Sequence, residues 1–171
     1  MANHVIVGGG PGGMNAIETI RGYDSNASIT LVSNEPAYAR MALPYYISGD
    51  VGEDHVLTGN QDYFEGLGVT TRFGVRVTSV DPGANKITLD DGSSLPYDNL
   101  LIATGSSPQK LNIPGADGDG VYNLWTIEDA RQATAALRGD AEVAFIGAGF
   151  IGFIILNAIH KLGDRAHVIE L

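Results

Sequence analysis

Three glycines near the start of the chain directly follow a short apolar run and have the spacing G-x-G-x-x-G: Gly8, Gly10 and Gly13. In a loop of this kind the first glycine permits a tight turn, the second lets a phosphate approach the backbone, and the third lets the next helix pack closely. We predict that this helix covers residues 14–21, with its N-terminal N–H groups facing the phosphates. The pattern indicates a dinucleotide-binding site, and the alternative is a glycine-rich turn in an ordinary α/β domain.

Two polar residues, Asn34 and Glu35, follow a second strand that is predicted over residues 29–33. They lie about 20 residues beyond the glycines, where a dinucleotide site places the group that accepts a hydrogen bond from a ribose hydroxyl. We assign the ribose role to these two positions together. The alternative is that both are solvated loop residues at the end of a strand.

The same pattern recurs near the end of the chain. After a strand predicted over residues 142–146, the spacing G-x-G-x-x-G is repeated by Gly147, Gly149 and Gly152. A helix is predicted over residues 153–162, and the strand after it ends at an acidic residue, Glu170. Two such units indicate two dinucleotides, which is more specific than either unit alone. Since one βαβ unit cannot make a doubly wound domain, we expect the second domain to be cut off or completed elsewhere.

Composition excludes several classes of function. The 171 residues carry a net charge of −10, which argues against binding to nucleic acid or to anionic membrane surfaces. The chain has no cysteine, so it cannot supply a redox-active disulfide, a thiolate nucleophile or ligands for an iron–sulfur cluster. No metal site is predicted. No apolar run reaches the ~18 residues of a membrane span, and we expect a cytoplasmic protein.

The rest of the chain alternates helical and extended patterns around a loop-rich stretch at residues 106–120, where we place a domain boundary. Residues 36–51 are aromatic and nearly uncharged, and their single arginine, Arg40, could neutralise a pyrophosphate or lie on the surface. The predicted elements between the glycine loops are a short helix over residues 61–66, a parallel strand over 69–72, a β-meander over 75–92, a buried strand over 99–105 and a helix over 126–137 that Thr126 caps.

These motifs together resemble those of the two-dinucleotide flavoprotein reductases, the pyridine nucleotide–disulfide oxidoreductase family. The resemblance rests on residues 7–13, 97–105, 113–115 and 147–152, which occur in the order typical of that family. It implies an α/β fold with a Rossmann-like FAD-binding domain that contains the β-meander and the start of a second, NAD(P)-binding domain. We expect the first segment of the FAD-binding domain over residues 1–110, a connector over 111–125, and a truncated NAD(P)H-binding domain over 126–171.

The resemblance also implies a set of cofactor contacts. Val77 matches a position that meets adenine through its backbone, and residues 103–105 match a signature that lines the flavin nucleotide. The residues expected at FAD are Gly8, Gly10, Pro11, Gly12, Gly13, Asn34 or Glu35, Arg40, Val77, Ala103, Thr104 and Gly105. The residues expected at NAD are Gly147, Gly149, Phe150, Ile151, Gly152 and Glu170, with Phe150 as the aromatic gate that nicotinamide displaces.

Three departures from the family distinguish this chain. Met41 stands where some members carry a catalytic cysteine, and the absence of that cysteine argues against disulfide, peroxide and cysteine-assisted oxidase chemistry. Without that cysteine, the chain resembles the branch of the family that holds ferredoxin, rubredoxin and nitrite reductase-like proteins. Tyr45 and Ile154 stand where this branch commonly has a lysine and a glutamate that pair near the flavin. Because both charged residues are absent together, no unpaired charge is buried. We predict that Tyr45 and Ile154 face each other across an apolar flavin–nicotinamide site. The alternative is that the match at Tyr45 is off by one residue and that Ile154 belongs to the core of its helix.

The resemblance therefore implies an FAD-dependent NAD(P)H oxidoreductase that prefers NADH. Hydride passes from nicotinamide to flavin, and electrons continue to a separate acceptor such as a small iron–sulfur or rubredoxin-like protein, or a fused module. The alternatives are a cysteine-independent NADH oxidase and a non-catalytic FAD- and NAD-binding redox sensor. The family adds a C-terminal interface domain, through which a homodimer is possible. Since the segment that closes the FAD site is also absent, we expect this N-terminal fragment to be inactive.

Overall fold

The computed structural model describes residues 2–137 and 139–170, and their packing divides the chain into two compact units. Unit 1 comprises Met1–Ala39 and Leu57–Ser106, and unit 2 comprises Arg40–Val56 and Ser107–Leu171. The elements of unit 1 are β1 (Asn3–Val7), α1 (Pro11–Tyr23), β2 (Ser28–Ser33), α3 (Gln61–Gly66), β3 (Val69–Phe73), β4 (Val77–Asp81), β5 (Lys86–Leu89), β6 (Ser94–Pro96) and β7 (Asn99–Ile102). Those of unit 2 are η1 (Arg40–Ala42), α2 (Leu43–Ile47), η2 (Glu53–His55), α4 (Ile127–Ala136), β8 (Glu142–Ile146), α5 (Phe150–Leu162) and β9 (Arg165–Ile169).

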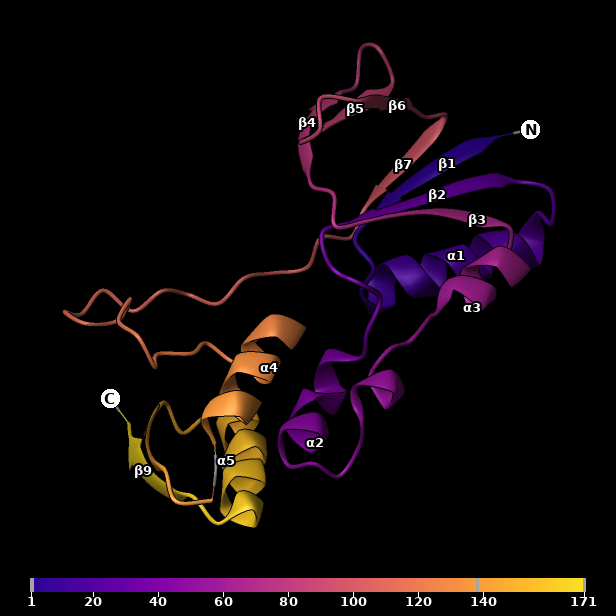
Figure 1. Ribbon diagram of the computed structural model, residues 1–171. Coiled ribbons are helices and arrows are strands. Elements are labelled where there is room, and N and C mark those ends of the chain that lie inside the picture. The colour runs from indigo at the N-terminus through magenta and orange to yellow at the C-terminus, as the bar shows by residue number, and fades with distance from the viewer. Residues whose placement is uncertain (1, 138, 171) are drawn as a thin grey trace. The chain divides into compact units, whose positions relative to one another are not determined.

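Unit 1 is a three-layer α/β structure around a parallel sheet with the strand order β3-β2-β1-β7 (Figure 1). Successive side chains of a strand point to opposite faces, so Ile6 packs in one core with α1 and α3. Val5 and Val7 pack on the other face in a second core with Ile87 and Leu89 of the meander. Both faces of the central strand β1 are therefore covered, as its continuous apolar sequence requires. The predicted Rossmann-like fold is confirmed.

Both helices that follow a glycine loop begin three residues earlier than predicted. α1 begins at Pro11 and α5 at Phe150, after the extended N-cap residues Gly10 and Gly149. Proline suits the first position of a helix because its fixed φ is helical and its missing N–H has no intrahelical partner there. The helices predicted over residues 14–21 and 153–162 began too late in the sequence, because the whole glycine motif was assigned to the loop.

Two strand predictions also need correction. β4 begins at Val77 rather than at Val75, because the Val75 N–H donates to the Ser33 carbonyl, 3.3 Å away, at the end of β2. The strand predicted as buried over residues 99–105 ends at Ile102 and lies at the edge of the described sheet. Its Leu101 and Ile102 side chains are 40% and 60% exposed. An apolar run alone did not distinguish a central strand from an edge strand.

Unit 2 contains the parallel pair β8–β9 together with the helices α2, α4 and α5. Thr126 caps α4 as predicted: its hydroxyl accepts a hydrogen bond from the Asp129 N–H at 3.1 Å, and the Asp129 carboxylate accepts from the Thr126 N–H at 2.7 Å. This reciprocal capping box satisfies donors that would otherwise lack partners at the helix start. No helix among the described residues combines the length and the apolar character needed to cross a membrane.

We expect the substitution Thr126→Ala to lower the free energy of unfolding by about 1 kcal/mol, because it removes the acceptor of the capping box. Urea unfolding of the full-length protein measures this change. Thr134→Ala is the matched control within α4, since the Thr134 hydroxyl only donates back to the Ala130 carbonyl inside the helix. Equal losses from the two substitutions would contradict a specific role for the cap.

A second pair of substitutions tests the backbone contact between α1 and its glycine loop. A Cβ atom at Gly13 would lie 2.0 Å from the Gly8 carbonyl oxygen, whereas a Cβ at Gly22 in the same helix would meet nothing within 4 Å. We expect Gly13→Ala to lower the free energy of unfolding by ~1–3 kcal/mol. Gly22→Ala should leave it unchanged or raise it, since alanine favours helix. A Gly13→Ala protein as stable as the Gly22→Ala protein would refute this contact.

Candidate functional site

The first glycine loop joins β1 to α1 at the carboxyl edge of the sheet, and its glycines have different roles. Gly8 has a φ of 112°, and a Cβ there would lie 2.2 Å from the Ala103 carbonyl oxygen. Gly13 allows the helix to approach that loop, whereas a Cβ at Gly10 would meet nothing within 4 Å. The first and third positions therefore exclude side chains for packing reasons, and the second leaves open space at the helix N-terminus. These are the properties that a pyrophosphate requires there.

The end of β7 lies directly beside this loop. The Ala103 N–H donates to the Val7 carbonyl at 2.8 Å, and a Cβ at Gly12 would be 3.6 Å from the Ala103 Cβ. The structure thus brings together Gly8, Gly12 and Ala103, which were predicted from separate motifs. Thr104 and Gly105 follow as exposed residues, and Gly105 has a φ of 69°. Small residues at this edge keep the approach to the loop open.

The two polar residues after β2, Asn34 and Glu35, differ in their surroundings. Asn34 is exposed, whereas Glu35 is half-buried and accepts a hydrogen bond from the Tyr38 hydroxyl at 2.6 Å. The Glu35 N–H donates to the Ser33 hydroxyl at 3.3 Å, and that hydroxyl would be 3.4 Å from a Cβ on Gly9. Glu35 therefore lies next to the glycine loop with its side chain already held. Tyr38 was missed by the sequence reasoning as a partner of this glutamate.

The second glycine loop repeats this geometry in unit 2. Gly147 has a φ of 104°, and its N–H donates to the Ile169 carbonyl at 2.8 Å. A Cβ at Gly152 would lie 2.9 Å from the Gly147 carbonyl oxygen, and one at Gly149 would meet nothing within 4 Å. The Glu170 carboxylate accepts a hydrogen bond from the Ala148 N–H of the loop. Strand, loop and helix thus have the same arrangement as in unit 1, whereas Glu170 directly follows its strand and Glu35 lies two residues beyond the end of β2.

Residues around this second loop present apolar surface. Phe150, the predicted nicotinamide gate, is 80% exposed, and Ile151 beside it is 53% exposed. Ile154, one turn along α5 from Phe150, is half-buried. Tyr45 lies on α2 with 53% of its side chain exposed. Although α2 packs against α5 within unit 2, a meeting of Tyr45 with Ile154 stays a prediction.

Arg40 belongs to unit 2, where it binds Trp125. Its guanidinium donates to the Trp125 carbonyl and lies 4.8 Å from the centroid of the indole ring. A cation over an aromatic face is stabilised by the negative face of the ring. Arg40 is half-buried by these contacts, so it is not the fully exposed surface residue of the alternative interpretation. Its predicted contact with FAD stays a prediction, as does that of the half-buried Val77 in β4.

Ion pairs that the sequence did not reveal attach residues 40–56 to the helices of unit 2. Glu53 forms a two-pronged pair with Arg131 of α4, with distances of 2.5 and 3.0 Å, and the hydrogen bonds from Arg131 lower the pKa of the Glu53 carboxyl. Asp50 accepts from the Lys161 ammonium of α5 at 2.7 Å, which lowers the pKa of the Asp50 carboxyl. Each pair joins residues that are distant in sequence, so no local pattern could have predicted it.

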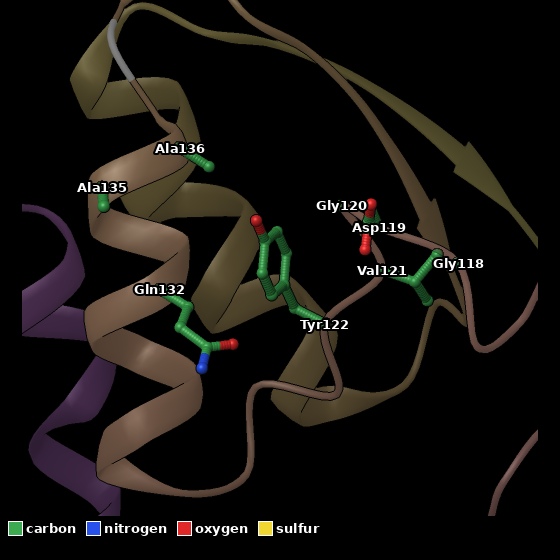
Figure 2. A pocket seen from close by; sticks show the side chains of 8 residues that line it. All are labelled: Gly118, Asp119, Gly120, Val121, Tyr122, Gln132, Ala135 and Ala136. Carbon is green, nitrogen blue, oxygen red and sulfur yellow. The ribbon is translucent and has the colours of Figure 1, made fainter.

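A separate hollow of about 540 Å³ lies in unit 2 between α4 and residues 118–122 of the predicted connector. Figure 2 shows the Tyr122 ring facing α4 near Gln132, with Asp119 on the loop beyond it. Asp119 is the only carboxylate in the lining, and none of the predicted cofactor contacts belongs to it. The two glycine loops, rather than this hollow, therefore carry the candidate chemistry.

Comparisons with known proteins agree with this geometry. The family described as pyridine nucleotide-disulphide oxidoreductase matches residues 2–171. The chain is 32% identical to rhodocoxin reductase of Rhodococcus erythropolis over 97% of this chain and 40% of that protein. It is 30% identical to rubredoxin-NAD(+) reductase of Pseudomonas putida over 97% of this chain and 44% of that protein. The chain thus spans less than half the length of these curated relatives.

A solved structure shows the same fold. The NAD-dependent persulfide reductase from A. fulgidus superposes with a TM-score of 0.91 at 33% sequence identity, over 98% of this chain and 33% of that one. Members of the matched family are oxidoreductases that bind FAD and use NAD(P)H, which are the two dinucleotides expected here. With a family match over nearly its whole length and two glycine loops of the required geometry, the chain belongs to the pyridine nucleotide-disulphide oxidoreductase family.

Proposed function

We propose that the protein transfers electrons from NAD(P)H through FAD to a separate small redox protein. The observation that carries this proposal is the duplication of one geometry. Each unit has a glycine loop with a backbone contact that excludes a Cβ, an open second glycine, and an acidic residue after the next strand whose carboxylate accepts a hydrogen bond. Two dinucleotides are the ligands that fit two such loops.

In the first loop, the chain's own residues bind and orient FAD. The N-terminus of α1 stabilises the negative pyrophosphate, and Gly10 leaves room for it. Glu35 accepts hydrogen bonds from the adenosine ribose, and residues 103–105 border the nucleotide. When bound, FAD supplies the redox chemistry by accepting hydride from nicotinamide and releasing electrons onward.

In the second loop, α5 and Glu170 bind the pyridine nucleotide. The N-terminus of α5 faces the pyrophosphate as α1 does, and the Glu170 carboxylate is held by the Ala148 N–H. Phe150 lies in the first turn of α5 with 80% of its side chain exposed, which suits its proposed role as the aromatic gate that nicotinamide displaces. NADH is the preferred donor, because a carboxylate accepts from a ribose 2′-hydroxyl and repels a 2′-phosphate.

The electrons must then leave this part of the protein. The chain has no cysteine, so no disulfide here can accept them and be reduced to thiols. Its relatives include a reductase named for rubredoxin and one named for rhodocoxin. A small iron–sulfur or rubredoxin-like protein, or a fused module of that kind, is therefore the proposed acceptor.

Flavin content tests the proposal directly. We expect the full-length protein to bind FAD non-covalently, with a flavin absorbance spectrum that NADH bleaches under anaerobic conditions. Gly10→Val should weaken FAD binding, because the side chain would fill the open space at the start of α1. The proposal is refuted if the full-length protein contains no flavin after purification and takes up none on reconstitution. If the protein binds flavin that NADH never reduces, the non-catalytic sensor is favoured.

The choice of nicotinamide donor depends on Glu170. We expect faster anaerobic flavin reduction by NADH than by NADPH, because the Glu170 carboxylate repels the 2′-phosphate of NADPH. Stopped-flow reduction with each nucleotide measures this preference, and Glu170→Gln should decrease it. The matched control is Glu142→Gln. Glu142 begins β8, at the end of the strand away from the glycine loop, and its carboxylate pairs with Arg165. Equal or faster reduction by NADPH in the unaltered protein would contradict the assignment.

The predicted apolar pair of Tyr45 and Ile154 is tested by a double-mutant cycle. Tyr45→Lys or Ile154→Glu alone should slow flavin reduction by NADH or destabilise the holoenzyme, because each places an unpaired charge beside the proposed apolar flavin–nicotinamide site. The double variant should recover part of the loss through an ion pair. Unfolding of the holoenzyme and stopped-flow reduction provide the two measurements. Strictly additive effects would show that the two side chains do not meet.

A further inference from the structure

Tyr38 and Glu35 form a short hydrogen bond beside the first glycine loop. The Tyr38 hydroxyl donates to Glu35 Oε2 at 2.6 Å, a length typical of a hydroxyl bound to a carboxylate. The two side chains differ in exposure, since Tyr38 is 5% exposed and Glu35 is half-buried. The buried Tyr38 side chain thus holds the carboxylate of Glu35, which is more accessible to solvent.

The position of the Tyr38 hydroxyl is set by contacts from a distant part of unit 1. The backbone of Tyr38 pairs with that of Leu57 in an antiparallel bridge. The neighbouring Ala37 is fully buried, and its carbonyl accepts a hydrogen bond from the Thr58 N–H at 3.0 Å. Because the backbone is anchored and the ring is buried, the hydroxyl has little freedom to follow a moving carboxylate.

The backbone of Glu35 is anchored as well. Its N–H donates to the hydroxyl of the buried Ser33, which lies next to Gly9 of the glycine loop. Glu35 is therefore held at its backbone by Ser33 and at its carboxylate by Tyr38. This double attachment limits the movement of the Glu35 side chain relative to its backbone.

We propose that Tyr38 is a positioning residue that orients the Glu35 carboxylate for the adenosine ribose of FAD; this inference rests on the proposed function. A glutamate loses side-chain rotamer freedom when it binds a ligand, and a side chain that is held in advance avoids most of that cost. A carboxylate accepts several hydrogen bonds, so the bond from Tyr38 is compatible with one from a ribose hydroxyl. Tyr38 is thus a determinant of selectivity for the ribose hydroxyl.

The test compares FAD with its 2′-deoxyadenosine analogue in the full-length apo-protein, by flavin fluorescence titration. We expect the unaltered protein to bind the analogue about tenfold more weakly than FAD, because the analogue cannot donate from the 2′ position. Tyr38→Phe keeps the ring but not the hydroxyl. It should weaken FAD binding by about tenfold and reduce the discrimination against the analogue to less than threefold.

Tyr63→Phe is the matched control. The Tyr63 hydroxyl also donates to a glutamate of unit 1, Glu18, at 2.6 Å, but that pair joins α3 to α1 instead of bordering the glycine loop. This control should retain both the affinity for FAD and the discrimination. A general effect of losing a tyrosine hydroxyl would appear in both variants.

A second variant covers the case in which Tyr38→Phe does not fold. Glu35→Asp keeps the charge and leaves Tyr38 in place, but it withdraws the carboxylate from the hydroxyl by one methylene group. Discrimination between FAD and the analogue should fall in Glu35→Asp as it does in Tyr38→Phe. If this variant keeps the discrimination of the unaltered protein, the positioning role is wrong.

The remaining outcomes separate this inference from the proposed function. If Tyr38→Phe weakens FAD and the analogue equally, Tyr38 has only a structural role. If the unaltered protein binds FAD without distinguishing the analogue, the role of Tyr38 is refuted while the proposed function stands. If the unaltered protein binds no FAD, both fail.

Discussion

Backbone crowding where β1, β7 and α1 meet is the constraint on which unit 1 depends. Gly8 approaches the Ala103 carbonyl, and Gly13 approaches the Gly8 carbonyl, so closely that neither position has room for a Cβ. These contacts set the end of the central strand and the start of the helix in one place. As a result, the N–H groups of α1 face open space beside Gly10 at the carboxyl edge of the sheet. The architecture and the proposed anion site therefore share one physical cause.

The two glycine loops solve the same problem with different supporting contacts. In unit 1, the acid after the strand is oriented by a buried tyrosine from the following segment. In unit 2, Glu170 is held by the Ala148 N–H of the loop itself. A side-chain donor thus holds the acid in one unit and a backbone donor holds it in the other. The first arrangement adds a residue that can vary independently of the loop, whereas the second couples the acid directly to the loop backbone.

Residues 40–56 pack with unit 2 through both buried apolar side chains and ion pairs. Leu43 and Ile47 of α2 are buried. The acidic residues Asp50 and Glu53 pair with Lys161 and Arg131. Arg40 adds its stacking on Trp125. Tyr45, which is predicted to lie near the flavin, is therefore in a segment attached to the helices of the nucleotide-binding unit that contains Phe150. Predicted cofactor contacts that follow each other in sequence are consequently divided between the two compact units.

The sequence by itself determined the local features of this protein. Glycine spacing located both loops, Thr126 marked the start of α4, and strand patterns located β5 and β8 with their observed bounds, because these features depend on neighbouring residues. It also determined the family, since the motifs occur together in one order. Only the tertiary structure decided that the strand after the meander lies at an edge, that Glu35 rather than Asn34 is held beside the loop, and that residues 40–56 pack with unit 2. Each of these outcomes depends on contacts between residues far apart in the chain or on a specific side-chain orientation, which composition, spacing and periodicity do not encode.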